Sequence, residues 1–417
     1  MPPAWSAGKR RDYLPKSELG ALIDVLQKEG YTIVGPTVVD GVVSLRPVRS
    51  LEDLARGLQD EQGPGTYRTR EADPDLYFQH VVGPDGPKRY LFPPTQTLFG
   101  LHVEGRRFVV DAGPPEPPKL AFLGVRPCEL AAMAVQDRVF GASDPRTFRC
   151  ESNPYYSQVR EAALVIAVNC TRPGGNCFCA SMGTGPVASE GFDLAMTELR
   201  AGFVVEVGSP RGAELVRKLK VREPTAAELE LAELRLAQAA AGMGKKLDTS
   251  GLPELLEAAV EHPHWDDVGK RCLGCGNCTM VCPTCSCGSI LDSTDLPART
   301  ATRTRQWESC FTHQFTYTTS GPVRTTIRAR YRHWLRHKLS TWLAQYGTMG
   351  CVGCGRCVTW CPVGIDLTQE VAAIRGEAAA KHHDAGHPAG RTAGTARLDG
   401  GRLAGSGNFP GAKGVRA

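Results

Sequence analysis

Two short runs of the sequence each hold four cysteines at the same spacing. The first is Cys272-Leu-Gly-Cys-Gly-Asn-Cys-Thr-Met-Val-Cys-Pro and the second is Cys351-Val-Gly-Cys-Gly-Arg-Cys-Val-Thr-Trp-Cys-Pro. This spacing, closed by a Cys-Pro step, is typical of chains that bind cubane [4Fe-4S] clusters. In two-cluster ferredoxins the first three thiolates of a run bind one cluster and the fourth binds the other. The sequence therefore predicts two interlocked sites of four thiolates each.

The two predicted sets of ligands each draw on both runs. The first cluster would take Cys272, Cys275, Cys278 and Cys361, and the second would take Cys351, Cys354, Cys357 and Cys282. A pair of zinc ribbons is the main alternative, but structural zinc usually has paired cysteines at each half-site. A disulfide framework is disfavoured because the sequence opens without an apolar signal segment, as MPPAWSAGKRRDYL. We expect reduced thiols and a cytoplasmic protein.

A third set of cysteines follows two expected strands of the N-terminal half. Lys119–Val125 and Ala163–Val168 are continuous apolar runs, which indicate buried parallel strands, and Cys128 and Cys170 come just after them. Ligands of open α/β sheets bind outside the carboxyl ends of the strands. Cys177 and Cys179 lie in the Gly- and Pro-rich loop beyond Cys170. The four thiols predict a third [4Fe-4S] cluster; the alternative is four reduced cysteines packed as small apolar side chains.

Four further cysteines have no assignment. Cys285, Cys287 and Cys310 lie between the two runs, and three thiols complete a cubane only if another ligand joins them. Their role stays open at this point. Cys150 has no cysteine near it that suggests a site, and we expect it to be inert.

The chain divides into three expected parts. Residues 1–222 predict an α+β or α/β domain that carries the third cluster. Residues 223–383 predict a mainly α-helical, two-cluster ferredoxin-type domain, since 226–241, 252–260 and 327–346 have helical patterns. Residues 384–417 form a Gly-rich tail with one aromatic residue, which cannot bury enough surface to order itself without a partner.

The net charge of +5 is unevenly distributed. The segment from Arg299 to Lys338 has nine Lys and Arg residues against Glu308 alone. With its aromatic residues it could indicate a zinc-stabilised nucleic-acid binder. Because thiolate-bound cubanes are negatively charged, we expect this charge to face the clusters or an acidic subunit instead. No apolar run approaches the ~18 residues of a membrane span.

Several scattered motifs, together with the two runs, carry a family resemblance over roughly residues 15–375. They are Gly124-Val-Arg-Pro-Cys-Glu, Asn176-Cys-Phe-Cys-Ala-Ser-Met-Gly-Thr, His262-Pro-His-Trp-Asp, Cys282-Pro-Thr-Cys-Ser-Cys and Arg305-Gln-Trp-Glu-Ser-Cys. In these motifs the chain resembles the iron–sulfur beta subunit of soluble group 3 [NiFe] hydrogenases, the sulfhydrogenases. It is similar also to the A subunit of anaerobic sulfite reductase, a sister branch.

The resemblance implies an electron-transfer subunit of a cytoplasmic oxidoreductase complex, with no bond chemistry of its own. Its partners would be a flavin subunit that handles NAD(P)H and the small and large subunits of a [NiFe] hydrogenase, or a sirohaem sulfite reductase subunit. No catalytic residue, flavin or nucleotide is expected in this chain, because it lacks a G-x-G-x-x-G turn after a strand and a P-loop. A self-sufficient flavin reductase is the remaining alternative.

Overall fold

The computed structural model describes residues 10–111, 118–141 and 153–376 of the chain. By their contacts, the described residues belong to one unit. The Gly-rich tail and Cys150 lie outside the described residues. The expected domain boundary between residues 222 and 223 stays a prediction. None of the helices within the described ranges is long and apolar enough to cross a membrane.

The largest sheet has seven strands in the order β1-β11-β10-β9-β8-β2-β3. The strands are β1 (Arg11–Pro15), β2 (Thr32–Val39), β3 (Val42–Pro47), β8 (Leu120–Val125), β9 (Leu164–Val168), β10 (Leu194–Glu198) and β11 (Gly202–Val207). The central strands β2, β8, β9 and β10 pair in parallel. Strands β8 and β9 are buried along their whole length, which explains their continuous apolar sequences. The expected mixed α/β N-terminal region is confirmed.

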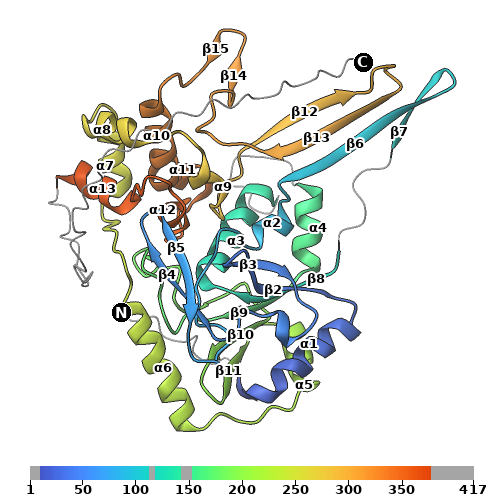
Figure 1. Cartoon of the computed structure of the whole chain (residues 1–417), viewed down its shortest axis with the longest axis vertical. Coiled ribbons are helices and arrows are strands. Elements are labelled where there is room, and N and C mark those ends of the chain that lie inside the picture. The colour runs from blue at the N-terminus through green and yellow to red at the C-terminus, as the bar shows by residue number, and fades with distance from the viewer. Residues whose placement is uncertain (1–9, 112–117, 142–152, 377–417) are drawn as a thin grey trace, which may run out of the picture. The chain divides into compact units, whose positions relative to one another are not determined.

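Helices cover both faces of this sheet (Figure 1). Helices α1 (Leu19–Lys28) and α5 (Pro210–Arg217) pack with alternate strand residues into one apolar core. Helices α3 (Pro127–Phe140) and α4 (Pro154–Ala162) pack on the opposite face into a second core. Because side chains alternate across a strand, each strand supplies both cores. Helices thus cover both faces of the sheet, and loops follow the carboxyl ends of its parallel strands.

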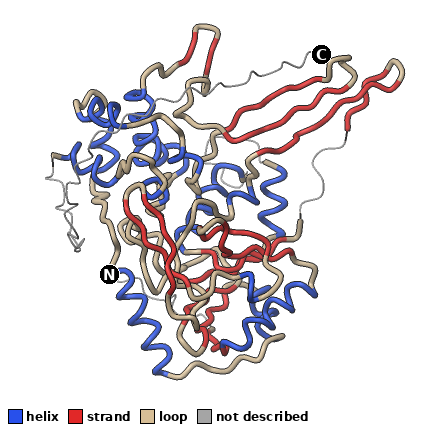
Figure 2. The backbone as a smooth tube through the Cα atoms, viewed as in Figure 1, coloured by secondary structure: helices blue, strands red, loops and turns tan. Residues whose placement is uncertain are grey.

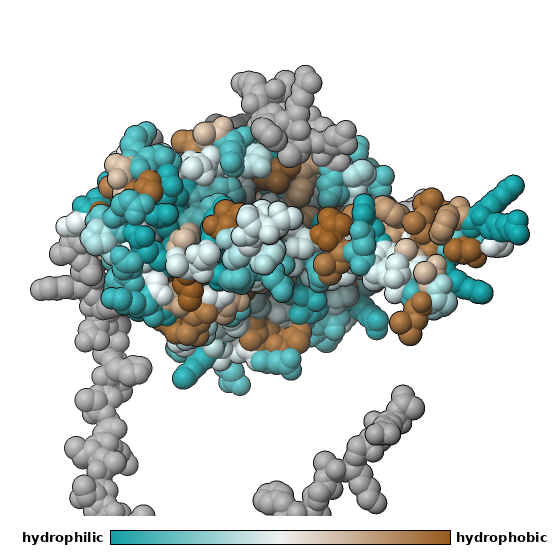
Figure 3. Space-filling view, turned by 90° about the horizontal axis from the view of Figure 1, so that it is seen from above, coloured by the Kyte–Doolittle hydropathy of each residue, from teal (hydrophilic) through white to brown (hydrophobic). Residues whose placement is uncertain are grey.

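A four-stranded sheet joins the two halves of the chain. Its order is β12-β13-β6-β7, with β12 (Gly288–Thr294), β13 (Thr300–Trp307), β6 (Thr95–Glu104) and β7 (Arg107–Asp111). It projects as a long ribbon in Figure 1 and carries exposed apolar side chains among polar ones (Figure 3). The mainly α-helical second domain is therefore not confirmed, since residues 288–307 form an antiparallel hairpin bonded to β6.

The remaining helices of the C-terminal half gather round the cysteine runs, apart from the first of them, which packs against β11 of the large sheet (Figure 2). They are α6 (Ala226–Ala241), α7 (Leu252–Ala258), α8 (His264–Arg271), α9 (Asn277–Met280), α10 (Ile327–Arg336), the π-helix η3 (His337–Thr341), α11 (Trp342–Tyr346), α12 (Arg356–Thr359) and α13 (Leu367–Arg375). Short elements complete the fold: η1 (Lys16–Glu18), η2 (Leu51–Asp53), α2 (Lys88–Leu91) and the hairpins β4–β5 (Leu58–Gly63, Thr66–Glu71) and β14–β15 (Tyr317–Thr318, Gly321–Pro322). One apolar core joins α7, α8, α10 and α13 and contacts cysteines of both runs.

Candidate iron–sulfur centres

The two cysteine runs have the same local backbone. The glycines on either side of the second cysteine take positive φ angles: 65° and 79° at Gly274 and Gly276, and 64° and 77° at Gly353 and Gly355. Residues with a Cβ atom are strained in this left-handed region, so glycine suits these positions. A four-residue helix follows in each run, α9 in the first and α12 in the second. The shared glycines therefore fold both runs into the same tight turn.

The first run lines a cavity. Its wall contains four thiols from the predicted first set, namely Cys272, Cys275, Cys278 and Cys361. The last of these comes from the second run. The aromatic side chains of Phe311, Tyr331 and Trp334 also line it. The structure thus brings together the residues that the spacing assigned to one cluster.

The second run lines a further cavity. Its wall contains the predicted second set, Cys351, Cys354, Cys357 and Cys282, together with Phe178 and Lys338. Here the fourth thiol comes from the first run. Cys357 lines both cavities, so the two spaces are adjacent.

The thiols of both sets surround a space rather than a point. Within the described part of the chain, no three His, Cys, Asp or Glu side chains are arranged to hold a single metal ion. Zinc needs four ligands within about 2.0–2.3 Å of one ion, whereas a cubane spreads four thiolates over four irons. The donor sets and the cavities fit a cluster.

Unpaired donors at the first cavity support this fit. The Tyr331 hydroxyl and the Trp334 indole N–H are buried without a hydrogen-bond partner among the described residues. Both side chains line the cavity that holds the first thiol set. Hydrogen bonds to cluster sulfurs are one way in which proteins adjust the potential of a cubane. Cluster sulfur would give these donors the acceptors that they lack.

A buried lysine is bonded to the second set. Lys338 is 3% exposed, and its Nζ donates to Cys282 Sγ at 3.0 Å and to Thr284 Oγ1 at 3.2 Å. A hydrogen bond with Cys285 and the Lys338 ammonium hold the pKa of Cys282 well below its usual range. By contrast, burial raises the pKa of Cys351 to about 12. Cys282 is therefore prepared as a thiolate, and its neighbour Cys351 needs a metal to lose its proton.

The third predicted set is also brought together. Cys128, Cys170, Cys177 and Cys179 are all buried, and Cys128 interacts electrostatically with Cys179 and Cys170. Cys177 interacts in the same way with Cys170. Burial raises the pKa of Cys177 to about 12 and the pKa values of Cys128 and Cys179 well above their usual range. The four thiols lie close together beyond the carboxyl ends of β8 and β9.

The second run packs directly against this third set. The amide of Phe178 donates to the Gly353 carbonyl at 2.9 Å. A Cβ atom added at Gly353 would lie only 2.7 Å from the Cα of Cys179. Cys354 also shares a buried apolar cluster with Cys128 and Cys179. The three sets therefore follow one another: the first cavity, the second cavity, and the thiols at the edge of the large sheet.

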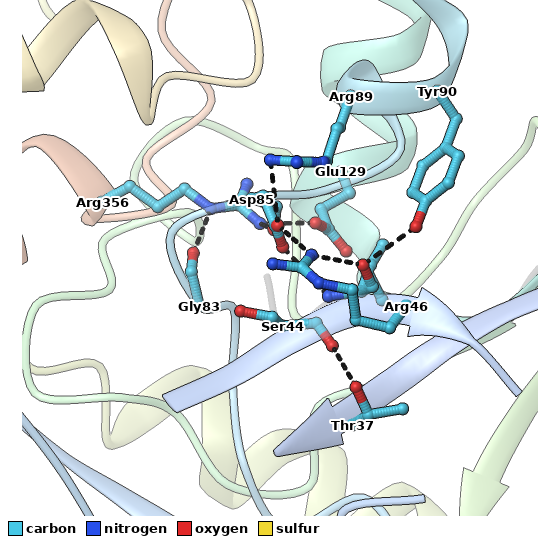
Figure 4. Close-up of polar contacts among 10 residues, drawn as sticks. Thr37, Ser44, Arg46, Gly83, Asp85, Arg89, Tyr90, Glu129 and Arg356 are labelled. Carbon is cyan, nitrogen blue, oxygen red and sulfur yellow. Dashed lines mark hydrogen bonds and ion pairs between the residues drawn. The ribbon is translucent and has the colours of Figure 1, made fainter. Parts of the chain in front are cut away.

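One arginine anchors the second run to the N-terminal half (Figure 4). Arg356 is 1% exposed and pairs with Glu129 of α3 at 2.5 Å between Nη2 and Oε1. The same guanidinium donates to the carbonyls of Gly83 at 2.6 Å and Asp85 at 2.8 Å. Asp85 in turn pairs with Arg46. Glu129 follows Cys128 in the sequence. The Arg356–Glu129 ion pair therefore fixes the position of the second thiol set relative to the third.

The unassigned thiols lie beside the second set. The side chain of Cys285 is hydrogen-bonded to that of Cys282, and the side chains of Cys287 and Cys310 are hydrogen-bonded to each other. Lys88, at 6% exposure, donates to the Cys282 carbonyl at 3.1 Å. Burial lowers the pKa of Lys88 to about 8, although the nearby thiols oppose the shift. The ammonium therefore stays mostly protonated at pH 7.

Comparison with known proteins agrees with this geometry. Residues 271–365 match the family described as a 4Fe-4S dicluster domain. The chain is also 30% identical over 332 residues to sulfhydrogenase 2 subunit beta of Pyrococcus furiosus, which covers 78% of this chain and 94% of that relative. The chain belongs to the sulfhydrogenase beta subunit family. No solved structure matches it.

The match confirms the resemblance expected from the scattered motifs. The matched dicluster region contains both cysteine runs. Together with the relative, it supports this chain as an iron–sulfur, electron-transfer subunit of the sulfhydrogenase type.

Most of the charged residues at these sites were not predicted from the sequence. The basic segment from Arg299 to Lys338 was expected to face the clusters or an acidic subunit. Of its nine cations, Lys338 is the one with a hydrogen bond to a thiol among the described residues. Others pair with carboxylates, as Arg303 does with Asp292 and Arg332 with Glu261. Lys88 and Arg356 come from outside that segment, and no local pattern in the sequence marks them.

Proposed function

We propose that this chain relays electrons through two [4Fe-4S] clusters held by the two interlocked thiol sets. The first is bound by Cys272, Cys275, Cys278 and Cys361, and the second by Cys351, Cys354, Cys357 and Cys282. The observation that carries the proposal is the exchange of the fourth thiol between the runs at two adjacent cavities. Clusters bound there supply one-electron redox chemistry. The protein holds the thiolates, excludes water and sets the local charge.

A third [4Fe-4S] cluster at Cys128, Cys170, Cys177 and Cys179 extends this relay. Its support is the burial and proximity of the four thiols and the packing of Phe178 against the second run. The order of the sets gives the relay a direction in space, from the first cavity to the edge of the large sheet. No catalytic residue is assigned to this chain.

The proposed partners are those of a cytoplasmic hydrogenase complex. They are a flavin subunit that exchanges electrons with NAD(P)H, and the small and large subunits of a [NiFe] hydrogenase. The name of the relative, a sulfhydrogenase subunit, supports this branch over the sulfite reductase branch. Isolation of the chain with its native partners tests the choice: nickel in the complex supports the hydrogenase branch, and sirohaem contradicts it.

Anaerobic purification of the full chain tests the cofactor assignment. We expect a brown protein with about four irons and four sulfides for each occupied site, hence about twelve irons for three sites. Reduction by dithionite should give electron paramagnetic resonance (EPR) signals of reduced cubanes. A colourless protein that contains zinc would instead support the nucleic-acid binder, and tightly bound flavin would support a self-sufficient reductase.

A further inference from the structure

Three thiols outside the proposed sites meet at the base of the β12–β13 hairpin. Cys287 immediately precedes β12, and Cys310 lies three residues beyond β13. The amide of Glu308 donates to the Cys287 carbonyl at 3.0 Å, which closes the base of the hairpin. The side chains of Cys287 and Cys310 are in contact, and Cys285 interacts electrostatically with Cys287. The hairpin therefore brings together three thiols that lie between positions 285 and 310 of the chain.

Two buried lysines lie beside these thiols. Lys88 Nζ lies 3.9 Å from the centroid of the Trp307 ring and donates to the Cys282 carbonyl. Lys338 Nζ donates to Cys282 Sγ on the other side. Throughout the described ranges, neither lysine forms an ion pair with a carboxylate. Both are more than nine-tenths buried.

This charge needs a negative partner. A buried ammonium group is strongly destabilising unless an opposite charge compensates it. Cys282 of the second thiol set compensates the positive charge of Lys338. Lys88 lies beside Cys285 and Cys287 as well as Cys282, so these thiols supply its counter-charge as thiolates. An iron–sulfur cluster bound by thiolates is an anion and provides such a counter-charge.

We propose that Cys285, Cys287 and Cys310 bind a further iron–sulfur cluster, a [4Fe-4S] cubane held by three protein thiolates. Its fourth iron takes a ligand other than cysteine. The inference rests on the proposed relay, because the contact between Cys282 and Cys285 places this site directly beside the second thiol set. Lys88 supplies the compensating positive charge. The site is a branch of the relay, and its fourth iron is open to exchange.

The test uses the chemistry that sets a three-thiolate cubane apart. Mild oxidation removes the iron without a cysteine ligand and leaves a [3Fe-4S] cluster, which is paramagnetic when oxidised, whereas intact four-thiolate cubanes are EPR-silent in that state. The anaerobically purified full chain is treated with a small excess of ferricyanide. We expect this oxidised-state signal in the wild type. Cys287→Ser should lose it together with about four irons per chain, while Cys150→Ser keeps both.

A second variant keeps every thiol. Lys88→Met removes the compensating charge and should reduce the oxidised-state signal roughly twofold or more. The exposed Lys246→Met is the matched control and should leave the signal unchanged. In Cys287→Ser and Lys88→Met alike, the dithionite-reduced signals of the two run-based sites should persist.

Two results would overturn the proposal. One is an unchanged iron content and oxidised-state signal in Cys287→Ser. The other is a disulfide between Cys287 and Cys310, found by peptide mapping of the iron-replete protein. Failure of the relay itself has a different signature, because the wild-type chain would then give no reduced-state cubane signal at all.

Discussion

The two cysteine runs share their spacing and backbone but lie in different surroundings. In the first run Leu273 is 62% exposed and Cys275 is exposed, whereas in the second the equivalent Val352 is 3% exposed and Cys354 is buried. The position before the third cysteine is the exposed Asn277 in one run and the buried Arg356 in the other. A shared motif thus groups the thiols, while the packing around it decides solvent access and charge. The first site is partly exposed to solvent, and the second is buried inside the protein.

Removal of one thiol from each run should have the largest effect. Cys275→Ser and Cys354→Ser should each lose or convert one cluster and release up to about four irons. Their reduced-state EPR spectra should differ, because each variant keeps the site that the other lacks. Electron transfer in the assembled complex should fall in both. Unaltered iron content and turnover in either variant would contradict the assignment of that thiol.

The anchor of the second run gives the next largest effect. Arg356→Met leaves Glu129 buried without its partner, and breaking a buried pair in this way costs about 3–5 kcal/mol of unfolding free energy. The equivalent Asn277→Met removes one exposed bond to the Trp360 carbonyl at 3.3 Å, worth about 1 kcal/mol or less. Anaerobic urea unfolding of the two variants measures the difference. Equal losses would show that the second run is no better anchored than the first.

The buried Lys338 ammonium should give the two run-based sites different reduction potentials. Lys338→Met removes a positive charge bonded to Cys282, so the more negative reduced state becomes less favourable and the potential of the second site falls. A charged hydrogen bond of about 1.5–3 kcal/mol corresponds to a shift of about 65–130 mV for one electron. EPR-monitored redox titration measures it. The exposed Lys270→Met, beside the first run, should leave both potentials in place.

Much of this arrangement could be predicted from local patterns. Continuous apolar sequence identified β8 and β9, because parallel strands are buried on both faces. Cysteine spacing predicted two interlocked sets of thiols, and the four members of each set line a common cavity. The hairpin of β12 and β13 was missed because the ribbon is largely exposed and lacks an apolar face. Its partner β6 is about two hundred positions earlier in the chain.

The buried charged residues that contact the thiol sets could not be predicted in the same way. Lys88 reaches Cys282 across 194 positions, and Arg356 reaches Glu129 across 227. Neither residue stands in a motif that indicates such a contact. Because tertiary packing decides which charges are buried, local patterns do not distinguish the few cations that face the thiols from the many that face solvent.

Acid should destabilise helix α10, which lines the first cavity. Burial, with Arg324 nearby, lowers the pKa of His333 on α10 to about 4. Between pH 6.5 and 4 the unfolded chain therefore binds more protons than the folded one, and the folded state loses stability as the pH falls through this window. Because His333 is partly exposed, we expect about 1 kcal/mol or less. His333→Gln should flatten the pH dependence of urea unfolding, and a slope identical to the wild type would exclude this contribution.

The exchange of the fourth thiol between the runs is tested most directly by two crossed variants. Cys361→Ser lies in the second run but should destroy the first site, so its reduced-state EPR spectrum should match that of Cys275→Ser. Cys282→Ser lies in the first run and should match Cys354→Ser. If instead Cys361→Ser matches Cys354→Ser, each run binds its own cluster with its own four thiols, and the interlocked arrangement is wrong.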